Sequence, residues 1–310
     1  MITVIGETVA DAFVSTSPSG PGVLDLRVRP GGGPANTAVA LGRLGAPTAF
    51  AGRIPRGPLG DLLRRHLTGS GVDLTRAVTA KEEPTLAVAS IDGHGNAVYS
   101  FYATGTADFQ WTEAELGHAV PAEATCLHAG SLALALEPGG PLIERLLVRR
   151  RPGTTVSIDP NIRPGIVPVE RYRSLLPAWS SVADVLKLSD DDLGHLMPGV
   201  SPGAACDAWH ADGVRLVVVT LGSRGAYASL DGERVTVPAS PVIPVDTVGA
   251  GDAFTAGLLY RLHTAGVLHG RLTGLDTDLL TRALTFAADV AAETCRQRGA
   301  DPPRLADLPA

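Results

Sequence analysis

The stretch Pro244-Val-Asp-Thr-Val-Gly-Ala-Gly-Asp-Ala-Phe-Thr-Ala-Gly257 is the most informative part of the sequence. Three small residues, Gly249, Ala250 and Gly251, lead into a helical pattern over residues 253–263. The N-terminus of a helix offers free N–H groups and the positive end of the helix dipole. Because small residues let an anion approach the backbone closely, the pattern indicates a phosphate site that needs no lysine.

Asp252 falls in the first turn of this expected helix. A carboxylate there can accept the proton of a hydroxyl group that attacks a phosphoryl group. The structural alternative is an N-cap, a common role for Asp at the start of a helix. A dinucleotide-binding loop fits less well, because Phe254 stands at the third glycine of GxGxxG and Pro238, Pro241 and Pro244 interrupt any strand before the loop.

Composition narrows the classes of protein. The chain has 310 residues, 45% of them hydrophobic, which suits one large α/β domain with a small appendage. Its net charge of −6 and its lack of an extended basic stretch argue against a nucleic-acid partner. No apolar run is long enough for a membrane span, no signal peptide is evident, and the three cysteines form no pair, so we expect a cytoplasmic protein.

The basic residues exclude one kind of phosphate site. Of the 26 basic residues only Lys81 and Lys187 are lysines, and neither lies in a GxxxxGKS/T context. A Walker-type phosphate loop is therefore excluded. Any phosphate must be held by backbone amides, a metal ion or arginine.

Short apolar runs alternate with amphipathic segments along the chain. This alternation predicts a doubly wound, mostly parallel sheet with helices on both faces. The expected strands are residues 2–5, 48–52, 124–129, 154–158, 184–188 and 214–221. The expected helices are residues 35–44, 58–67, 141–150, 169–179, 203–211, 250–263 and 276–296.

Two regions, residues 9–28 and 85–104, depart from this rhythm. The first has the pattern of a strand, a turn and a strand, and the second alternates around the hairpin turn Asp92-Gly93-His94-Gly95. We expect them to form a small antiparallel sheet that projects from a single domain spanning residues 1–310. A lid over a binding cleft, an extension of the main sheet and a dimer contact are the alternatives for its role.

The stretch from Asp246 resembles the C-terminal signature of the ribokinase (PfkB) carbohydrate kinase family at essentially every constrained position. In that family the aspartate that closes the motif is the catalytic base, and the small residues before it form an anion hole. The resemblance assigns the first role to Asp252 and the second to Gly249, Ala250 and Gly251. It also implies a ribokinase-like fold and a reaction that uses ATP with Mg²⁺.

The N-terminal half carries further resemblances on the sugar side. Residues 31–45 resemble the family's GG-x-P-A-N segment, which implies sugar contacts by Gly32, Gly33 and Asn36. The loop before Asp11 resembles the first sugar-contacting loop, with Asp11 accepting from two hydroxyls. A helix-initiating turn and a surface carboxylate are the respective structural alternatives.

Two later segments resemble the family's nucleotide side. Residues 220–226 resemble the nucleotide-binding turn, and residues 187–192 resemble the K-x-N/S-x-x-E element that organises Mg²⁺ waters. Asp192 stands where glutamate is usual, so its reach is shorter. A tight turn, and Ser189 as the N-cap of a helix beginning at Asp190, are the alternatives. The implied nucleotide or metal contacts are Lys187, Ser189, Asp192, Thr220, Gly222, Gly225, Gly249 and Gly251.

Three more segments bear on substrate and ions. Asp159-Pro-Asn-Ile-Arg163 resembles the D-x-N-x-R element of fructokinases and ketodeoxygluconate kinases, in which the arginine reaches substrate or phosphate; a solvent-facing arginine is the alternative. Residues 100–103 resemble their F-Y-R lid strand, with Phe101 as a substrate-side candidate and Ala103 in place of the arginine. The tail at 295–300 resembles the adenine-side loop, and with Asp246 this region holds a monovalent cation such as K⁺ in many relatives.

These resemblances imply transfer of the γ-phosphoryl group of ATP to a hydroxyl of a neutral sugar, with bacterial fructokinases nearest in motifs and fructose favoured. A ribokinase, a nucleoside kinase and a non-catalytic sugar- or nucleotide-sensing relative are the alternatives, and a homodimer through the lid is one expected assembly. Two departures bear on specificity. Ala103 removes a carboxylate partner for an acid sugar, and Pro55-Arg56-Gly57 is expected to alter charge beside the active site.

Overall fold

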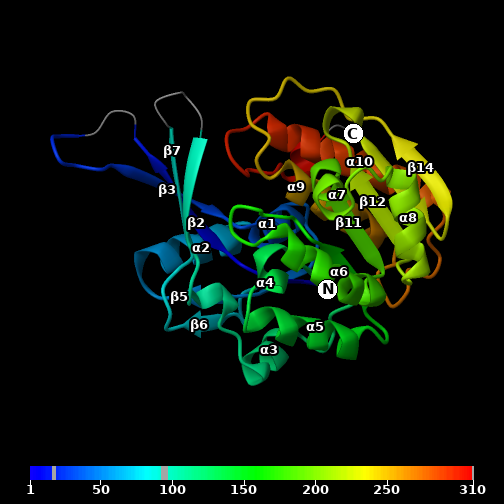
Figure 1. Cartoon of the computed structure of the whole chain (residues 1–310), viewed down its shortest axis with the longest axis horizontal. Coiled ribbons are helices and arrows are strands. Elements are labelled where there is room, and N and C mark those ends of the chain that lie inside the picture. Colours follow the sequence, from blue (N-terminus) through cyan, green and yellow to red (C-terminus); the bar gives the residue numbers. More distant parts are fainter. Residues whose placement is uncertain (16–18, 92–96, 309–310) are drawn as a thin grey trace.

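A mixed eight-stranded sheet forms the centre of the protein (Figure 1). The computed structural model describes residues 1–15, 19–91 and 97–308. The strands from β12 to β4 run parallel, and β13 and β14 extend one edge as an antiparallel hairpin. In spatial order the strands are β14 (Glu233–Val237), β13 (Ala226–Leu230), β12 (Leu216–Thr220), β11 (Val185–Ser189), β10 (Thr155–Asp159), β9 (Cys126–Gly130), β1 (Ile2–Ile5) and β4 (Thr48–Ala51).

Helices cover both faces of this sheet, as predicted. The sheet is apolar on both faces, and β12 shows this most plainly. Its residues Leu216 and Val218 pack into an apolar cluster on one face, and Val217 and Val219 pack into a second cluster on the opposite face. Strands buried on both faces are continuously apolar, which is the pattern of a doubly wound fold. One face carries α1 (Gly33–Arg43), α2 (Gly57–Gly69), α9 (Ala250–Thr264) and α10 (Thr277–Cys295). The other carries α3 (Glu113–Ala119), α4 (Ser131–Ala135), α5 (Gly139–Arg150), α6 (Val169–Val182), α7 (Asp190–Leu196) and α8 (Pro202–Ala211).

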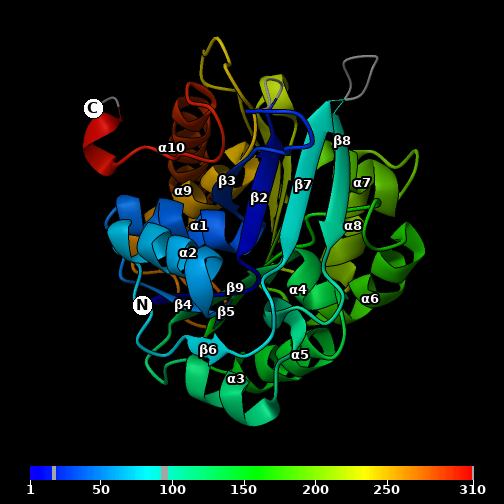
Figure 2. The ribbon, with the colours of Figure 1, turned by 90° about the vertical axis from the view of Figure 1, so that its left-hand side faces the viewer.

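A separate four-stranded sheet, here called the small sheet, projects from this body (Figure 2). Its order is β3 (Leu26–Gly31), β2 (Val9–Val14), β7 (Leu86–Ile91) and β8 (Ala97–Tyr102). The outer pairs are antiparallel, as predicted, whereas β2 and β7 join in parallel. The small sheet does not extend the large one, so that alternative is wrong. The predicted turn Asp92-Gly93-His94-Gly95 lies outside the described residues.

The remaining elements are short. The strands β5 (Arg53–Pro55) and β6 (Val78–Ala80) form a two-stranded parallel sheet near the base of the small sheet. Three 3₁₀ turns are η1 (Ala107–Phe109), η2 (Gly222–Arg224) and η3 (Leu305–Asp307). Within the described residues, none of the helices combines the length and the apolar character that crossing a membrane requires.

Candidate active site

A cleft of about 1390 Å³ lies at the C-terminal ends of β1, β10, β11 and β12, between the two sheets. Open α/β sheets bind their ligands at this edge. Of the residues predicted for the site, Ala250 and Gly225 do not line this cleft. The predicted site residues that line the cleft are Asp11, Gly32, Gly33, Asn36, Phe101, Arg163, Lys187, Ser189, Asp192, Thr220, Gly222, Asp246, Gly249, Gly251 and Asp252.

The loop before α9 has a backbone that only glycine fits well. Gly249 adopts φ 80°, in the left-handed region, and a Cβ there would lie 2.5 Å from the Cβ of Ala300. Gly249 is itself the N-cap residue of α9, so Asp252 is not the cap. Gly249 and Gly251 line the cleft at the start of α9, whereas Ala250 N donates to the Thr247 carbonyl at 3.2 Å and is not available to a ligand.

Asp252 is joined to α1, the helix that follows the glycine run. Its Oδ2 accepts from Asn36 Nδ2 at 2.9 Å, and its main-chain carbonyl accepts from Thr37 Oγ1 at 3.5 Å. A Cβ on Gly33 would lie 3.3 Å from Asp252 Oδ1 and 2.5 Å from Asn161 Nδ2. The absence of a side chain at Gly33 thus keeps the space in front of the Asp252 carboxylate open.

The surroundings of Asp252 suit a proton acceptor near neutral pH. Desolvation raises the pKa of Asp252 to about 6, against the hydrogen bond from Asn36. The Asp159 carboxylate contributes to this rise, and the charges of Lys187 and Arg163 oppose it. A general base works best when its pKa lies just below the working pH.

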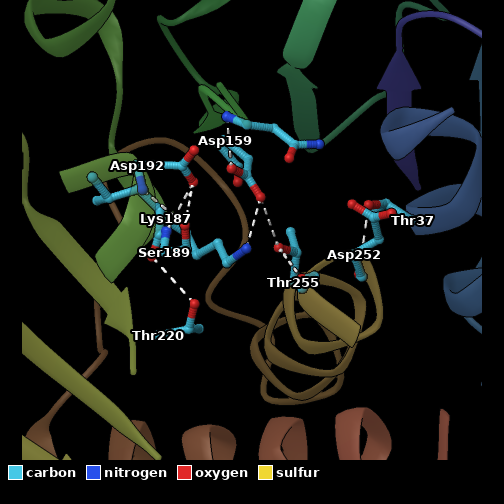
Figure 3. Close-up of polar contacts among 12 residues, drawn as sticks. Thr37, Asp159, Lys187, Ser189, Asp192, Thr220, Asp252 and Thr255 are labelled. Atoms are coloured by element: carbon cyan, nitrogen blue, oxygen red, sulfur yellow. Dashed lines mark hydrogen bonds and ion pairs between the residues drawn. The ribbon is translucent and has the colours of Figure 1, made fainter. Parts of the chain in front are cut away.

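Lys187 and Asp159 form a buried ion pair beneath the loop. Lys187 Nζ lies 2.8 Å from Asp159 Oδ2, and Figure 3 shows Thr255 of α9 approaching the same carboxylate, at 3.5 Å. Burial alone would lower the pKa of Lys187, but the Asp159 carboxylate offsets it and the pKa is raised. A Cβ on Gly251 would lie 3.2 Å from Lys187 Nζ, so a permanent positive charge sits directly beside the phosphate loop.

Asp192 is engaged by three protein donors. Its Oδ2 accepts from Ser189 N and Oγ, at 3.0 and 2.7 Å, and Ser189 Oγ accepts in turn from Asp192 N. This is a capping box at the start of α7, as the N-cap alternative for Ser189 predicted. Asp192 Oδ1 accepts from Ile162 N at 2.8 Å, which ties the loop after β10 to α7. Any metal-bound water would use the lone pairs that these donors leave.

Asp11 and Arg163 occupy the sugar-side end of the cleft. Asp11 lies on β2, and a Cβ on Gly31 of the neighbouring strand would clash with its carboxylate. Burial raises the pKa of Asp11 to about 6, and Arg163 opposes this rise. Arg163 is exposed, yet it lines the cleft and its charge acts on Asp11 and on Asp252. It is therefore not merely a loop arginine that faces bulk solvent.

The residues predicted to contact the nucleotide or a monovalent cation follow β12 or precede α9. Thr220 closes β12, and Gly222, with φ 57°, starts the turn after it. Gly225 packs instead against β14, where a Cβ would lie 2.0 Å from Val237 O. Asp246 accepts from Val248 N at 3.1 Å and from Gly299 N at 2.8 Å, which fastens the loop before α9 to the C-terminal segment.

Two departures from the family pattern lie away from the cleft. Arg56 is exposed at the N-cap position of α2, and Ala103 packs against the apolar cluster that contains Phe109 and Trp111. Neither residue lines the cleft. The expectation that Pro55-Arg56-Gly57 adjoins the active site is therefore wrong. The reason is that the turn leads into α2, whose apolar side packs down onto the large sheet.

Glu7 and Asn161 are among the cleft residues to which the sequence analysis assigned no role. Glu7 is 1% exposed, accepts from Ala133 N at 3.1 Å, and has a pKa that burial raises to about 7. Asn161 has φ 43°, and its amide approaches Gly33. Their positions directly after β1 and β10 were the available signal, because residues at strand ends reach the ligand edge.

Comparisons with known proteins agree with this geometry. Residues 1–307 match the pfkB family carbohydrate kinase model. A fructokinase of Rhizobium leguminosarum bv. trifolii is 36% identical over 252 residues, which cover 81% of this chain and 77% of the relative.

Solved structures of similar proteins cover nearly the whole chain. A double-mutant fructokinase from Vibrio cholerae O395, in its fructose, ADP and potassium ion bound form, has a TM-score of 0.82 at 29% identity and covers 96% of this chain and 93% of that one. The Xylella fastidiosa fructokinase with bound ATP has a TM-score of 0.84 at 26% identity, with 99% and 94% covered. The chain therefore belongs to the pfkB family of carbohydrate kinases.

Proposed function

We propose that this carbohydrate kinase is a fructokinase that transfers the γ-phosphoryl group of ATP to a primary hydroxyl of fructose. The observation that carries the proposal is the position of Asp252. Its carboxylate lies in the first turn of α9, beside the glycine loop, and it faces the cleft with a raised pKa. The names of the relatives favour fructose among neutral sugars.

Asp252 acts as the base in this proposal. Asn36 donates to one carboxylate oxygen and holds the side chain toward the cleft, which leaves Oδ1 to accept the hydroxyl proton. The hydroxyl oxygen then attacks the phosphoryl group in line with the leaving oxygen of ADP. Positioning and electrostatics supply most of the rate in such transfers.

The residues around the loop stabilise negative charge on the phosphoryl group in transit. The N–H groups at Gly249 and Gly251 lie at the start of α9, where the helix dipole is positive, whereas Ala250 N donates to the Thr247 carbonyl at 3.2 Å. Lys187 lies beside Gly251, and Arg163 lies close enough to act on Asp252. Together they form the anion hole of the proposed reaction.

The nucleotide end has the features that Mg-ATP needs. Thr220, Gly222 and Ser189 line an open end of the cleft. Asp191 and Asp192 place carboxylate oxygens in the first turn of α7, which suits Mg²⁺ held through water, whereas the Asp190 carboxylate is paired with Arg224 at 2.7 Å. When bound, Mg²⁺ neutralises charge on the phosphates. We also propose a K⁺ site near Asp246, after the potassium-bound relative.

The sugar end supplies hydroxyl partners and a cover. Asp11, Asn36 and the backbone at Gly32 and Gly33 present acceptors and donors, and Phe101 offers an apolar face. The small sheet would act as a lid of the single kinase domain, shielding the site from water and suppressing ATP hydrolysis.

The small sheet also suggests an assembly. Its exposed apolar side chains would be covered by the small sheet of a second copy in a homodimer, and light scattering would then give twice the mass of one chain. A monomer at micromolar concentration would contradict this part of the proposal. The exposed apolar side chains of the small sheet that do not line the cleft are Leu26, Val98 and Tyr102.

The experiment that tests the function is ADP release from Mg-ATP with fructose, ribose, ketodeoxygluconate, inosine and adenosine. We expect the highest kcat/KM with fructose, and ³¹P NMR of the product identifies the hydroxyl. A higher value with ribose or a nucleoside would contradict the substrate. Binding of nucleotide without turnover of any acceptor would contradict the kinase reaction and favour a sensor.

A further inference from the structure

The C-terminal segment 298–302, here called the tail segment, contacts elements from both ends of the cleft. Arg29 of β3 donates from Nη1 to the Arg298 carbonyl at 2.9 Å. Gly299 N donates to Asp246 at 2.8 Å, and Arg43 of α1 donates to the Pro302 carbonyl at 2.6 Å. The tail segment thus links the small sheet, the sugar-side helix and the loop before α9.

On the sugar side, the link begins beside Asp11. Arg29 lies directly opposite Asp11 in the register of β2 and β3, so the two residues share the face of the small sheet that lines the cleft. The cation that acts on the Asp11 carboxylate is Arg163. Arg29 instead extends from the small sheet to the tail segment, and it is half-buried in that position.

On the phosphate side, the link ends at the anion loop. Ala300 lies against Gly249. A Cβ added to Gly249 would be only 2.5 Å from the Cβ of Ala300. A Cβ on Gly299 would lie 3.1 Å from Arg29 Nη1, which shows how closely the guanidinium approaches the backbone of the tail segment. Two consecutive residues of the tail segment therefore touch Arg29 on one side and the phosphate loop on the other.

We propose that Arg29 is a positioning residue that couples sugar binding to nucleotide binding through the tail segment. The proposal rests on the proposed function, because it assigns the sugar to Asp11 and the phosphates to Gly249. A sugar bound at Asp11 fixes β2 and its neighbour β3. The Arg29 hydrogen bond then holds the tail segment against the loop that receives the phosphates.

Thermodynamic linkage makes this coupling measurable. If fructose at Asp11 strengthens nucleotide binding by some factor, nucleotide strengthens fructose binding by the same factor. Removal of the Arg29 donor should lower that factor toward one. It should have little effect on the nucleotide affinity of the sugar-free protein, in which the contacts of Arg43 and Asp246 with the tail segment remain.

The same strand offers a matched control. Arg27 lies two residues away on the same face, opposite Phe13, and also lines the cleft. Within the described part of the chain the Arg27 side chain makes no hydrogen bond or ion pair. Arg27→Met therefore removes an equal charge from the same wall without breaking the link.

The experiment is calorimetric titration of Mg-ADP with and without saturating D-fructose, for the full-length wild type, Arg29→Met, Arg29→Lys and Arg27→Met. We expect fructose to tighten ADP binding in the wild type, and the ratio of the two Kd values to fall at least about fivefold in Arg29→Met. Arg29→Lys should recover part of it, because an ammonium can still donate to a carbonyl. Arg27→Met should keep the wild-type ratio of the two Kd values, whatever its effect on the affinity for fructose itself.

Three results would overturn the inference: a wild-type ratio of one, an Arg29→Met ratio equal to that of the wild type, or a loss of ADP affinity that is the same with and without fructose. Circular dichroism shows whether each variant is folded. If Arg29→Met is not folded, the comparison with the wild type is made with Arg29→Lys. The proposed function fails separately, through absence of fructose phosphorylation by the wild type.

Discussion

The floor and the wall of the cleft are built differently. On the floor, polar side chains are already paired: Asp252 with Asn36, Lys187 with Asp159, and Asp192 with Ser189. On the wall, which is the small sheet, Tyr99 is 55% exposed and Phe101 39% exposed, and the two rings stack on each other. The floor is organised for one chemical step before any ligand arrives, whereas the wall presents surface that a sugar or another chain would cover.

This difference separates chemistry from specificity. Groups that must hold charge in a transition state work best when they are fixed in advance, because they then need no reorganisation during the reaction. Groups that select a substrate need only complementary surface. We therefore expect substitutions in the floor to lower kcat and substitutions in the wall to raise KM.

The largest expected effect in this series is on the phosphate loop. Gly249→Ala places a Cβ at a left-handed backbone position and 2.5 Å from Ala300, so the loop must shift. We expect kcat to fall about 100-fold or more, the scale seen when an anion-hole donor is displaced. Gly266→Ala is the control, since it has φ 73° in open space after the same helix.

The control variant should lose only about 1 kcal/mol of unfolding free energy, with kcat unchanged. Steady-state kinetics and thermal denaturation of both variants measure the two effects. Equal losses of activity in the two variants would mean that backbone strain alone, and not the geometry of the phosphate loop, accounts for the effect.

The next prediction concerns the pH dependence of kcat/KM and compares one carboxylate from the floor with one from the wall. Asp252 on the floor and Asp11 on the wall both have a pKa raised to about 6. A base and a hydroxyl acceptor must both be ionised, so kcat/KM should be level above pH 7. It should fall about tenfold or more per unit below pH 6, since two groups are then protonated.

The pH profile of kcat/KM for fructose measures this directly. In Asp11→Asn the acid limb should be shallower, because Asp252 alone remains to titrate. A level profile down to pH 5 would show that neither carboxylate is required in its ionised form.

The smallest effect is on the wall. Phe101→Ala should raise the KM for fructose about 5- to 20-fold, with kcat within about threefold, because partial loss of apolar contact costs about 1 to 2 kcal/mol. Tyr102→Ala is the matched control: Tyr102 is the next residue on β8, points to the other face and is 58% exposed. A raised KM in both variants would indicate a general loosening of the small sheet.

Much of the floor was predictable from sequence because its determinants are local. Residues 2–5 match β1 in full, since a strand buried on both faces is a continuous apolar run. The start of α9 follows from glycines immediately before an apolar helix. Asp252 needs only its place in that first turn to be recognised as a candidate base.

The wall was less predictable because its assembly is non-local. The parallel pairing of β2 with β7 joins residues more than 70 positions apart, and no local pattern specifies it. The hairpin β13–β14 was not expected, because its edge strand is short and begins with the charged residues Glu233 and Arg234, which are also typical of a loop. The location of Arg56, away from the cleft, likewise depends on how α2 packs.

One measurement tests the central claim most directly: single-turnover phosphorylation of fructose by Asp252→Asn, with the binding of fructose and Mg-ADP measured on the same preparation. Asparagine keeps the shape of the side chain and removes its capacity to take a proton. We predict a rate at least about 1,000-fold below the wild type, with both ligands bound within about threefold of wild-type affinity. A variant that keeps more than a few per cent of the wild-type rate would contradict the assignment of Asp252 as the catalytic base.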